Sequence, residues 1–90
     1  MERRNSERRE VPLTALKAGE TGTVASIKGG YERKWAFRKR LMDMGLTPRT
    51  RVTVVKLAPF HGPVEILVRG SRLALGRGMA ERILVEIENE

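Results

Sequence analysis

The side chains that most often do chemistry in proteins are scarce in this 90-residue chain. It contains one histidine, His61, one aspartate, Asp43, and no cysteine. A thiol nucleophile, a disulfide and a thiolate metal site are therefore excluded. A Ser-His-Asp triad would need Ser6, Ser26 or Ser71 beside His61 and Asp43, and nothing in the sequence indicates that these residues converge. We expect no catalytic residues and a chain that is not an enzyme.

The same scarcity argues against a metal centre. Ferrous iron sites use two or more histidine and carboxylate ligands with open positions. His61 has no second histidine, and Glu65 is its nearest carboxylate in sequence. A weak surface site made by these two residues is the alternative to a plain loop histidine, and we predict no metal ligands and no cofactor. The phosphate-binding pattern G-x-x-x-x-G-K-[ST] does not occur in the chain.

The most basic segment of the chain has residue types suited to recognition. Trp35 and Met42 are seven residues apart, with Arg38 and Lys39 between them. On a helix, Trp35 and Met42 lie on the side opposite Phe37, flanked by the two cations. Tryptophan and arginine are frequent in binding hot spots, so we predict that Trp35, Arg38, Lys39 and Met42 bind a partner. The alternative is that the helix buries Trp35 against the fold and that the cations form a solvated face.

The element that must position this face is a helix predicted over residues 31–44. The segment has no glycine, proline or β-branched residue, and Phe37, Leu41 and Met44 repeat at i, i+4 and i+7. We expect these three side chains to face the core. Gly45 follows where a left-handed C-cap residue belongs, and a Thr-Pro pair beyond it prevents the helix from continuing.

Asp43 lies near the end of this helix, where the helix dipole disfavours a carboxylate. Lys39 and Arg40 precede it by four and three residues, which is the spacing of ion pairs on a helix surface. We favour local ion pairing of Asp43 over a hydrogen bond to the fold or to a partner.

The remaining residues predict short strands. Apolar residues alternate, at least in part, over residues 21–27, 51–57, 64–69, 71–75 and 83–87. A parallel crossover needs about a dozen residues at each step, so five short strands and one helix in a chain of this length favour an antiparallel sheet. We expect a mainly β fold, a small antiparallel barrel of about five strands with one inserted α-helix. Its expected core comprises Phe37, Leu41, Met44, Val52, Val54, Ile66, Val68 and Leu73.

Length and charge limit the chain to one small basic domain. Its mass is 10.2 kDa, and Lys+Arg 18 against Asp+Glu 11 gives a net charge of +7, which attracts polyanions, acidic proteins and anionic lipids. Residues 1–10 mix arginines with glutamates and predict a disordered leader, and residues 11–88 predict the domain. No apolar run approaches the ~18 residues of a membrane span, and no signal-peptide core is present, so we expect a cytoplasmic protein.

Three blocks of the sequence carry a resemblance. They are PLTALKAGETGTVASIKGG, RKRLMDMGLTPRTRVTVV and APFHGPVEILVRGSRLALGRGMAERILVE. In order and spacing they are similar to the ferrous iron transport protein A family, FeoA. The resemblance implies an SH3-like barrel with a helix after the first strand. It also implies a cytosolic accessory of ferrous iron uptake that acts on FeoB, the membrane transporter with a cytosolic GTPase domain. The charged leader and the very basic helix depart from the family.

Two other classes of function are the alternatives to this role. Small basic barrels often bind nucleic acid, but aromatic residues make up only 4% of the chain and none lies on an expected strand, so a stacking platform is missing. The basic helix could instead attach to an anionic membrane, although its two-sided apolar pattern fits docking to a protein better. We therefore expect a non-enzymatic regulatory or assembly protein that binds the cytosolic domain of FeoB and no nucleic acid. No motif specifies its oligomeric state.

Overall fold

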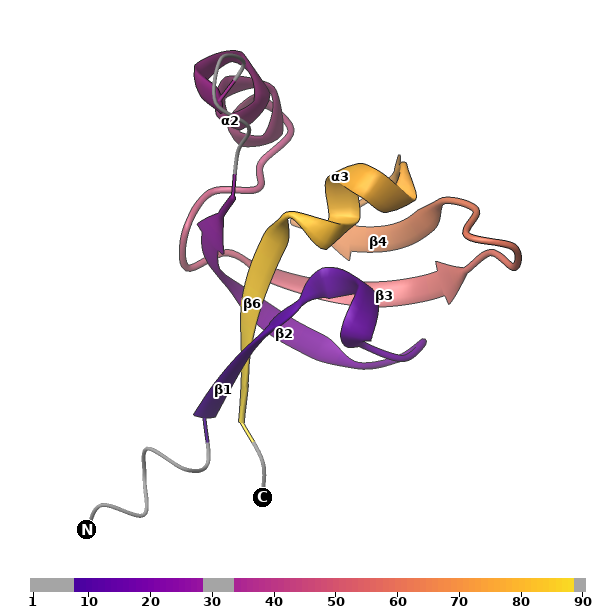
Figure 1. Ribbon diagram of the computed structural model, residues 1–90. Helices are drawn as coiled ribbons and strands as arrows, with labels where there is room; N and C mark the ends of the chain where they lie inside the picture. The colour runs from indigo at the N-terminus through magenta and orange to yellow at the C-terminus, as the bar shows by residue number, and fades with distance from the viewer. Residues whose placement is uncertain (1–7, 29–33, 89–90) are drawn as a thin grey trace, which may run out of the picture.

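The structure, a computed structural model, describes residues 8–28 and 34–88, with the side chains of residues 9–28 and 39–87. The described strands form one six-stranded sheet in the order β1-β6-β2-β3-β4-β5, and every neighbouring pair is antiparallel. This confirms the predicted mainly β antiparallel fold with an inserted helix (Figure 1). In chain order the elements are β1 (Arg8–Pro12), the 3-10 helix η1 (Leu13–Ala15), β2 (Thr21–Ile27), α2 (Lys34–Asp43), β3 (Arg51–Leu57), β4 (Val64–Val68), β5 (Ser71–Leu75), α3 (Arg77–Glu81) and β6 (Ile83–Glu88).

The number of strands corrects the prediction, because the described part of the chain has six rather than about five. The additional strand is β1, which begins inside the segment that composition assigns to the leader. Its Arg9 lies opposite Ile87, and its Val11 lies opposite Val85 in β6. β1 is an edge strand, and only its Val11 packs against the core. Such a strand is held largely by backbone hydrogen bonds to its neighbour. Because charged residues are common on sheet edges, the charged composition of this segment did not indicate a strand.

The bounds of the other strands follow the prediction closely. β2, β3 and β5 have the predicted bounds, β4 ends one residue earlier, and β6 extends one residue further. The helix α3 occupies residues for which we expected only a connection. Gly76 precedes it and Gly78 lies within it, and glycine lowers helix propensity by about 1 kcal/mol per residue. The burial of Ala80 holds this short helix against the fold.

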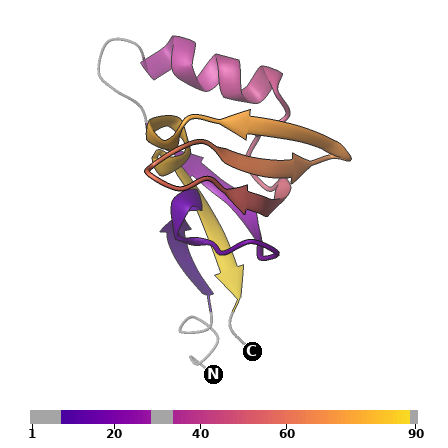
Figure 2. The ribbon, with the colours of Figure 1, turned by 90° about the vertical axis from the view of Figure 1, so that its right-hand side faces the viewer.

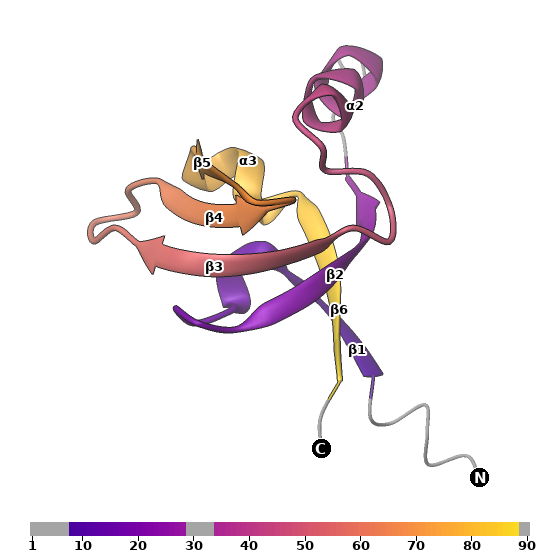
Figure 3. The ribbon, with the colours of Figure 1, turned by 180° about the vertical axis from the view of Figure 1, so that it is seen from behind.

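Two β-bulges bend the sheet around the core. The register shifts between Val24 and Ser26 where β2 pairs with β6, and between Val54 and Lys56 where β3 pairs with β4. An extra residue turns the following side chains to the other face. Val24 and Ile27 can therefore both be buried although they are three residues apart. In Figures 1 and 3, β3 and β4 run across the molecule while β6 and β1 descend steeply beside them.

The core lies inside this bent sheet. Of the eight residues expected there, five are buried: Leu41, Val52, Val54, Ile66 and Val68. Met44 and Leu73 are partly buried and pack against the core, whereas the side chain of Phe37 is outside the described residues. The other buried apolar residues are Leu13, Leu16, Val24, Ile27, Leu46, Val64, Leu75, Ala80, Ile83 and Val85.

The helix α2 connects β2 to β3 and lies to one side of the barrel (Figure 2). Its predicted end at Gly45 is confirmed by a φ of +94°. The amide of Leu46 donates to the carbonyl of Leu41 at 2.9 Å, and that of Gly45 donates to Met42 at 2.9 Å, which together make a Schellman motif. Both leucines are fully buried. Of the predicted helix, residues 31–33 lie outside the described part of the chain.

Candidate interaction surface

The outward face of α2 contains the residues that the sequence singled out for partner binding. Leu41 is fully buried, so the opposite side of the described helical turn is turned to solvent. Lys39 is exposed there, and 43% of Met42 is accessible, which makes it one of three exposed large apolar side chains in the described part of the chain. Trp35 and Arg38 belong to the helix, but their side chains are outside the described residues. The structure thus places two of the four predicted residues, Lys39 and Met42, on an accessible surface.

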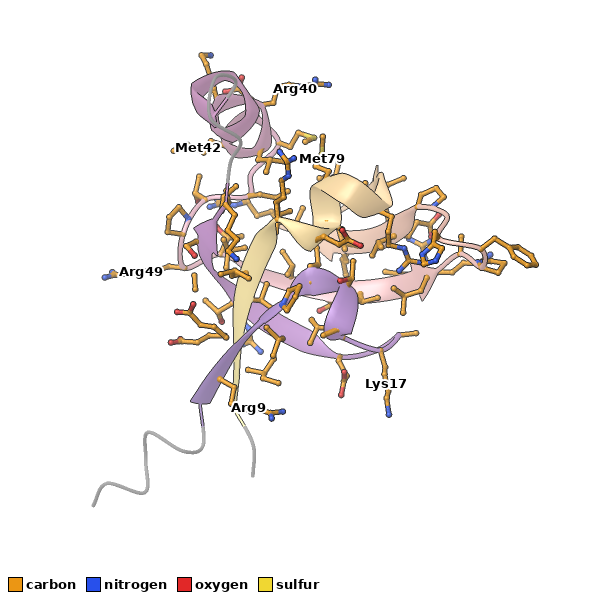
Figure 4. The ribbon with its side chains drawn as sticks, in the orientation of Figure 1. Arg9, Lys17, Arg40, Met42, Arg49 and Met79 are labelled. Atoms are coloured by element: carbon orange, nitrogen blue, oxygen red, sulfur yellow. The ribbon has the colours of Figure 1, made fainter. Side chains whose placement is uncertain are left out.

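The cationic charge of this face is partly compensated. Lys39 Nζ lies 3.4 Å from Asp43 Oδ2, one helical turn along, and confirms the predicted local pairing of Asp43. The two side chains are 58% and 66% exposed, so water screens the pair and its contribution to stability is small. Arg40 is also exposed, but in Figure 4 its side chain projects from the other side of α2 than that of Met42. The surface therefore combines a polarizable apolar side chain with one cation, Lys39, whose charge is only partly compensated.

Sequence reasoning did not single out one residue that projects to the same side of the molecule as Met42. Arg49 is exposed in the connection from α2 to β3, and in Figure 4 its side chain projects to the same side of the molecule as Met42. Its φ is +76°, and its amide donates to the carbonyl of Val24 at 2.7 Å, so the backbone beneath the side chain is fixed. The Pro-Arg-Thr turn was visible in the sequence, but the direction of Arg49 depends on the hydrogen bond to a distant strand. We call Lys39, Met42 and Arg49 the helix-side surface.

The residues weighed as a weak metal site lie on different elements. His61 is exposed in the loop between β3 and β4, whereas Glu65 is on β4 and its Oε1 lies 3.8 Å from Arg72 Nη1. Within residues 8–28 and 34–88, no group of three histidine, aspartate or glutamate side chains is arranged to hold a metal ion. The same part of the chain contains no helix long and apolar enough to cross a membrane.

A second exposed feature, which the sequence analysis did not single out, is Phe60 in the loop between β3 and β4. Its side chain is 94% exposed, more than that of any other large apolar residue in the described chain. The sequence did indicate an aromatic residue in a loop, because the six-residue segment APFHGP places Phe60 between two prolines. Without the hairpin geometry, that phenylalanine could equally have turned inward.

The bent antiparallel sheet, the helix inserted between β2 and β3 and the accessible helix-side surface together define a small β-barrel domain with an inserted helix. The chain belongs to the FeoA domain family, whose model matches residues 11–87. The predicted resemblance is therefore confirmed, and with it a place among proteins named for Fe(2+) transport.

Two relatives link this family to transport. A protein of Methanocaldococcus jannaschii assigned as Fe(2+) transport protein A is 36% identical over 75 residues, which are 83% of this chain and 84% of the relative. A fusion protein of Porphyromonas gingivalis, Fe(2+) transport protein A joined to the Fe(2+) transporter FeoB, is 31% identical over 75 residues. That match covers 83% of this chain and 8% of the fusion protein.

Solved structures support the fold. The solution structure of FeoA from Chlorobium tepidum has a TM-score of 0.74 at 36% identity, covering 86% of this chain and 70% of that one. The crystal structure of Stenotrophomonas maltophilia FeoA, a zinc complex described as a prokaryotic SH3 domain protein, has a TM-score of 0.68 at 22% identity. The match covers 83% of this chain and 93% of that one. At this sequence identity the similarity supports the fold alone. The fold is SH3-like, as the resemblance implied.

Proposed function

We propose that this chain is a cytoplasmic, non-enzymatic accessory protein of ferrous iron uptake that binds the cytosolic part of the FeoB transporter. The observation that carries the proposal is the fusion protein of Porphyromonas gingivalis, in which a segment 31% identical to this chain belongs to the same polypeptide as FeoB. Segments joined in one chain are held at high effective concentration, which favours a contact between them.

The partner-binding residues in this proposal are Trp35, Arg38, Lys39 and Met42 on α2, together with Arg49 in the connection from α2 to β3. Two features support this placement. Met42 is exposed where it could be buried by a partner, and Lys39 is accessible with the screened carboxylate of Asp43 beside it. Such a surface fits an acidic protein surface with an apolar patch, and the net charge of +7 favours the encounter.

The test is a titration of the purified chain with the cytosolic domain of FeoB from the same organism, at two ionic strengths. A charge-reversed variant, Arg38→Glu with Lys39→Glu, is compared with Lys17→Glu. Lys17 is also exposed, and Figure 4 shows it on the side of the molecule away from α2. We expect the helix variant to lose at least tenfold in affinity, and the Lys17 variant to stay close to the wild-type protein.

A nonspecific DNA duplex is titrated in parallel, because a basic barrel of this kind is also compatible with nucleic-acid binding. Binding to FeoB that persists at the higher salt concentration, with DNA binding lost, supports the accessory role. Tight DNA binding without any contact to FeoB would overturn it.

A further inference from the structure

The loop between β3 and β4 presents a single aromatic side chain at the end of a hairpin. In Figures 1 and 3 this hairpin end lies on the side of the barrel away from α2. Phe60 occupies the loop with 94% of its surface exposed, and Pro59, His61 and Pro63 around it are also exposed. We call residues 58–63 the hairpin tip. It is separate from the helix-side surface and has no part in the proposed contact described above.

The backbone of the hairpin tip is fixed by short-range hydrogen bonds. The amide of Ala58 donates to the carbonyl of Pro63 at 3.0 Å, and the amide of Gly62 donates to the carbonyl of Pro59 at 3.1 Å. The second bond closes a tight turn whose central residues, Phe60 and His61, have φ values of +57° and +59°. Positive φ is costly for a phenylalanine, so the turn persists only because its surroundings determine it.

One hydrogen bond holds the tip against the rest of the fold, and a close approach within the tip restricts its turn. Arg77 of α3 donates from Nη2 to the carbonyl of Ala58 at 2.9 Å. At Gly62 an added Cβ would lie 2.8 Å from Ala58 Cβ and 3.0 Å from the carbonyl of Pro59, so no larger residue fits without moving the turn. The consequence is that Phe60 is presented in one backbone conformation before any partner arrives.

A rigid, isolated aromatic side chain fits a pocket. Pre-organisation lowers the entropic cost of binding, and one buried aromatic anchor commonly dominates an interface. A fluid lipid surface gains nothing from a fixed turn, and one aromatic side chain anchors a protein to it only weakly. The geometry therefore favours a protein with an apolar pocket over a membrane.

The charges beside the tip indicate the rim of that pocket. Lys56 is exposed just before the tip with Glu65 opposite it in the register of β3 and β4, the partly buried Arg77 donates to the tip, and residues 58–64 contain no acidic side chain. A pocket bordered by carboxylates would complement these cations. A second copy of this chain is disfavoured as the occupant, because two bodies that each carry a net charge of +7 repel one another.

We infer that the hairpin tip is a second docking element, which inserts Phe60 into an apolar, acid-rimmed pocket on the cytosolic part of FeoB. This inference rests on the proposed function for the identity of the partner. It adds that the chain contacts that partner at two separated surfaces, an electrostatic one on α2 and an apolar one at the tip.

The test compares Phe60→Ala, Phe60→Leu and Leu67→Ala in titrations with the cytosolic domain of FeoB. Leu67 is the matched control, because it is a large apolar residue with 39% of its surface exposed but lies on β4 outside the tip. We expect Phe60→Ala to weaken binding at least tenfold, Phe60→Leu to keep most of the affinity, and Leu67→Ala to change little. Because Phe60 is almost fully exposed, its variants should have the thermal midpoint of the wild-type protein.

The salt dependence of binding distinguishes the contributions of the two surfaces. The loss caused by Phe60→Ala should persist at high ionic strength, whereas the loss caused by Lys39→Glu should shrink, because salt screens charges and not apolar contacts. The geometry of the tip is tested by Gly62→Ala, which keeps the phenylalanine but displaces the turn. It should lower the affinity several-fold if presentation matters.

Failure of this inference can be told apart from failure of the proposed function. If the wild-type chain does not bind FeoB, both are overturned. If it binds, Lys39→Glu weakens it and Phe60→Ala does not, then only the role of the tip is overturned. If Phe60→Ala instead abolishes sedimentation with phosphatidylglycerol vesicles while FeoB binding is unchanged, the tip is a lipid contact and the inference is wrong.

Discussion

Arg69 Nη2 lies 3.3 Å from Thr50 Oγ1 and thereby links two turns that are distant in sequence. Arg69 belongs to the tight turn between β4 and β5, while Thr50 closes the connection from α2 to β3. The stem of Arg69 also passes Gly45, where its Cδ would lie 3.6 Å from an added Cβ. The β4–β5 hairpin therefore contacts the segment that ends α2. This contact helps to determine where the helix-side surface lies relative to the barrel.

Thr50→Val should destabilise the protein by about 1 to 2 kcal/mol. Thr50 is buried, with 8% of its surface exposed, and its hydroxyl also lies 2.8 Å from Thr47 Oγ1. The substitution preserves shape but leaves both Thr47 and Arg69 without this partner, and an unsatisfied part-buried polar group costs about 1 to 3 kcal/mol. The measurement is the free energy of unfolding from urea denaturation.

The matched control for this experiment is Thr23→Val. Thr23 is a partly buried threonine in β2, and valine suits a strand at least as well as threonine. It should change the free energy of unfolding by less than about 0.5 kcal/mol. Equal effects of the two substitutions would show that the hydroxyl of Thr50 makes no specific contribution.

Gly45→Ala should cost about 1 kcal/mol, because alanine at a φ of +94° is strained while glycine is not. The control is Gly78→Ala in α3, where an added Cβ meets no atom within 4 Å and φ is not positive. That change should be neutral or stabilising by up to about 1 kcal/mol. Thermal unfolding of both variants checks the pair of predictions, and a Gly45 variant as stable as the wild-type protein would contradict the role of the Schellman motif.

Most of the fold was predictable from local sequence, because strands and helix ends leave short-range patterns. Val64, Ile66 and Val68 alternate and are all buried, and Gly45 ends α2 as its position predicted. β1 was not predictable, since its membership depends on pairing with β6, the last strand in sequence, rather than on its own side chains.

The candidate site was predictable only in part. Helical spacing correctly separated the buried Leu41 from the exposed Met42. Arg49 and Phe60 were missed because the direction of each depends on a backbone with positive φ. That backbone is fixed by the hydrogen bond to Val24 for Arg49, and by hydrogen bonds within the tip and from Arg77 for Phe60. Charge and aromatic content alone could not show that the side chain of Phe60 is almost fully exposed to solvent. The direction of such side chains can be found only from the three-dimensional structure of the turn, because neither arginine nor phenylalanine is typical of positive φ.

Gly22→Ala should destabilise the barrel by about 1 to 3 kcal/mol, which is typical of overpacking a core. A Cβ at Gly22 would lie 2.9 Å from both Cβ and Cγ2 of Val85, where neighbouring strands approach closely. The diagnostic measurement is a double-mutant cycle with Val85→Ala. Val85→Ala alone is destabilising because Val85 is fully buried. In the double variant Cγ2 is gone but the Cβ of residue 85 remains, so the clash is relieved in part. The cost of the double variant should therefore be smaller than the sum of the two single costs. Simple additivity would contradict the close approach.

The ion pair on α2 allows the effect of local charge on partner binding to be distinguished from the effect of net charge. Asp43→Asn removes the carboxylate 3.4 Å from Lys39 Nζ. The fold should change in stability by less than about 0.5 kcal/mol, because both side chains are largely exposed. If the helix-side surface contacts an acidic face of FeoB, releasing Lys39 should raise the affinity a few-fold at low salt, and the gain should shrink as salt is added.

The control for Asp43→Asn is Glu10→Gln, which changes the net charge by the same amount. Glu10 is an exposed residue of the edge strand β1 and belongs to neither the helix-side surface nor the hairpin tip. An equal gain from both substitutions would mean that total charge alone attracts the partner. A gain from Asp43→Asn only would place the acidic face of the partner against Lys39, because the Coulomb interaction of exposed charges is largely screened beyond about 10 Å at moderate salt.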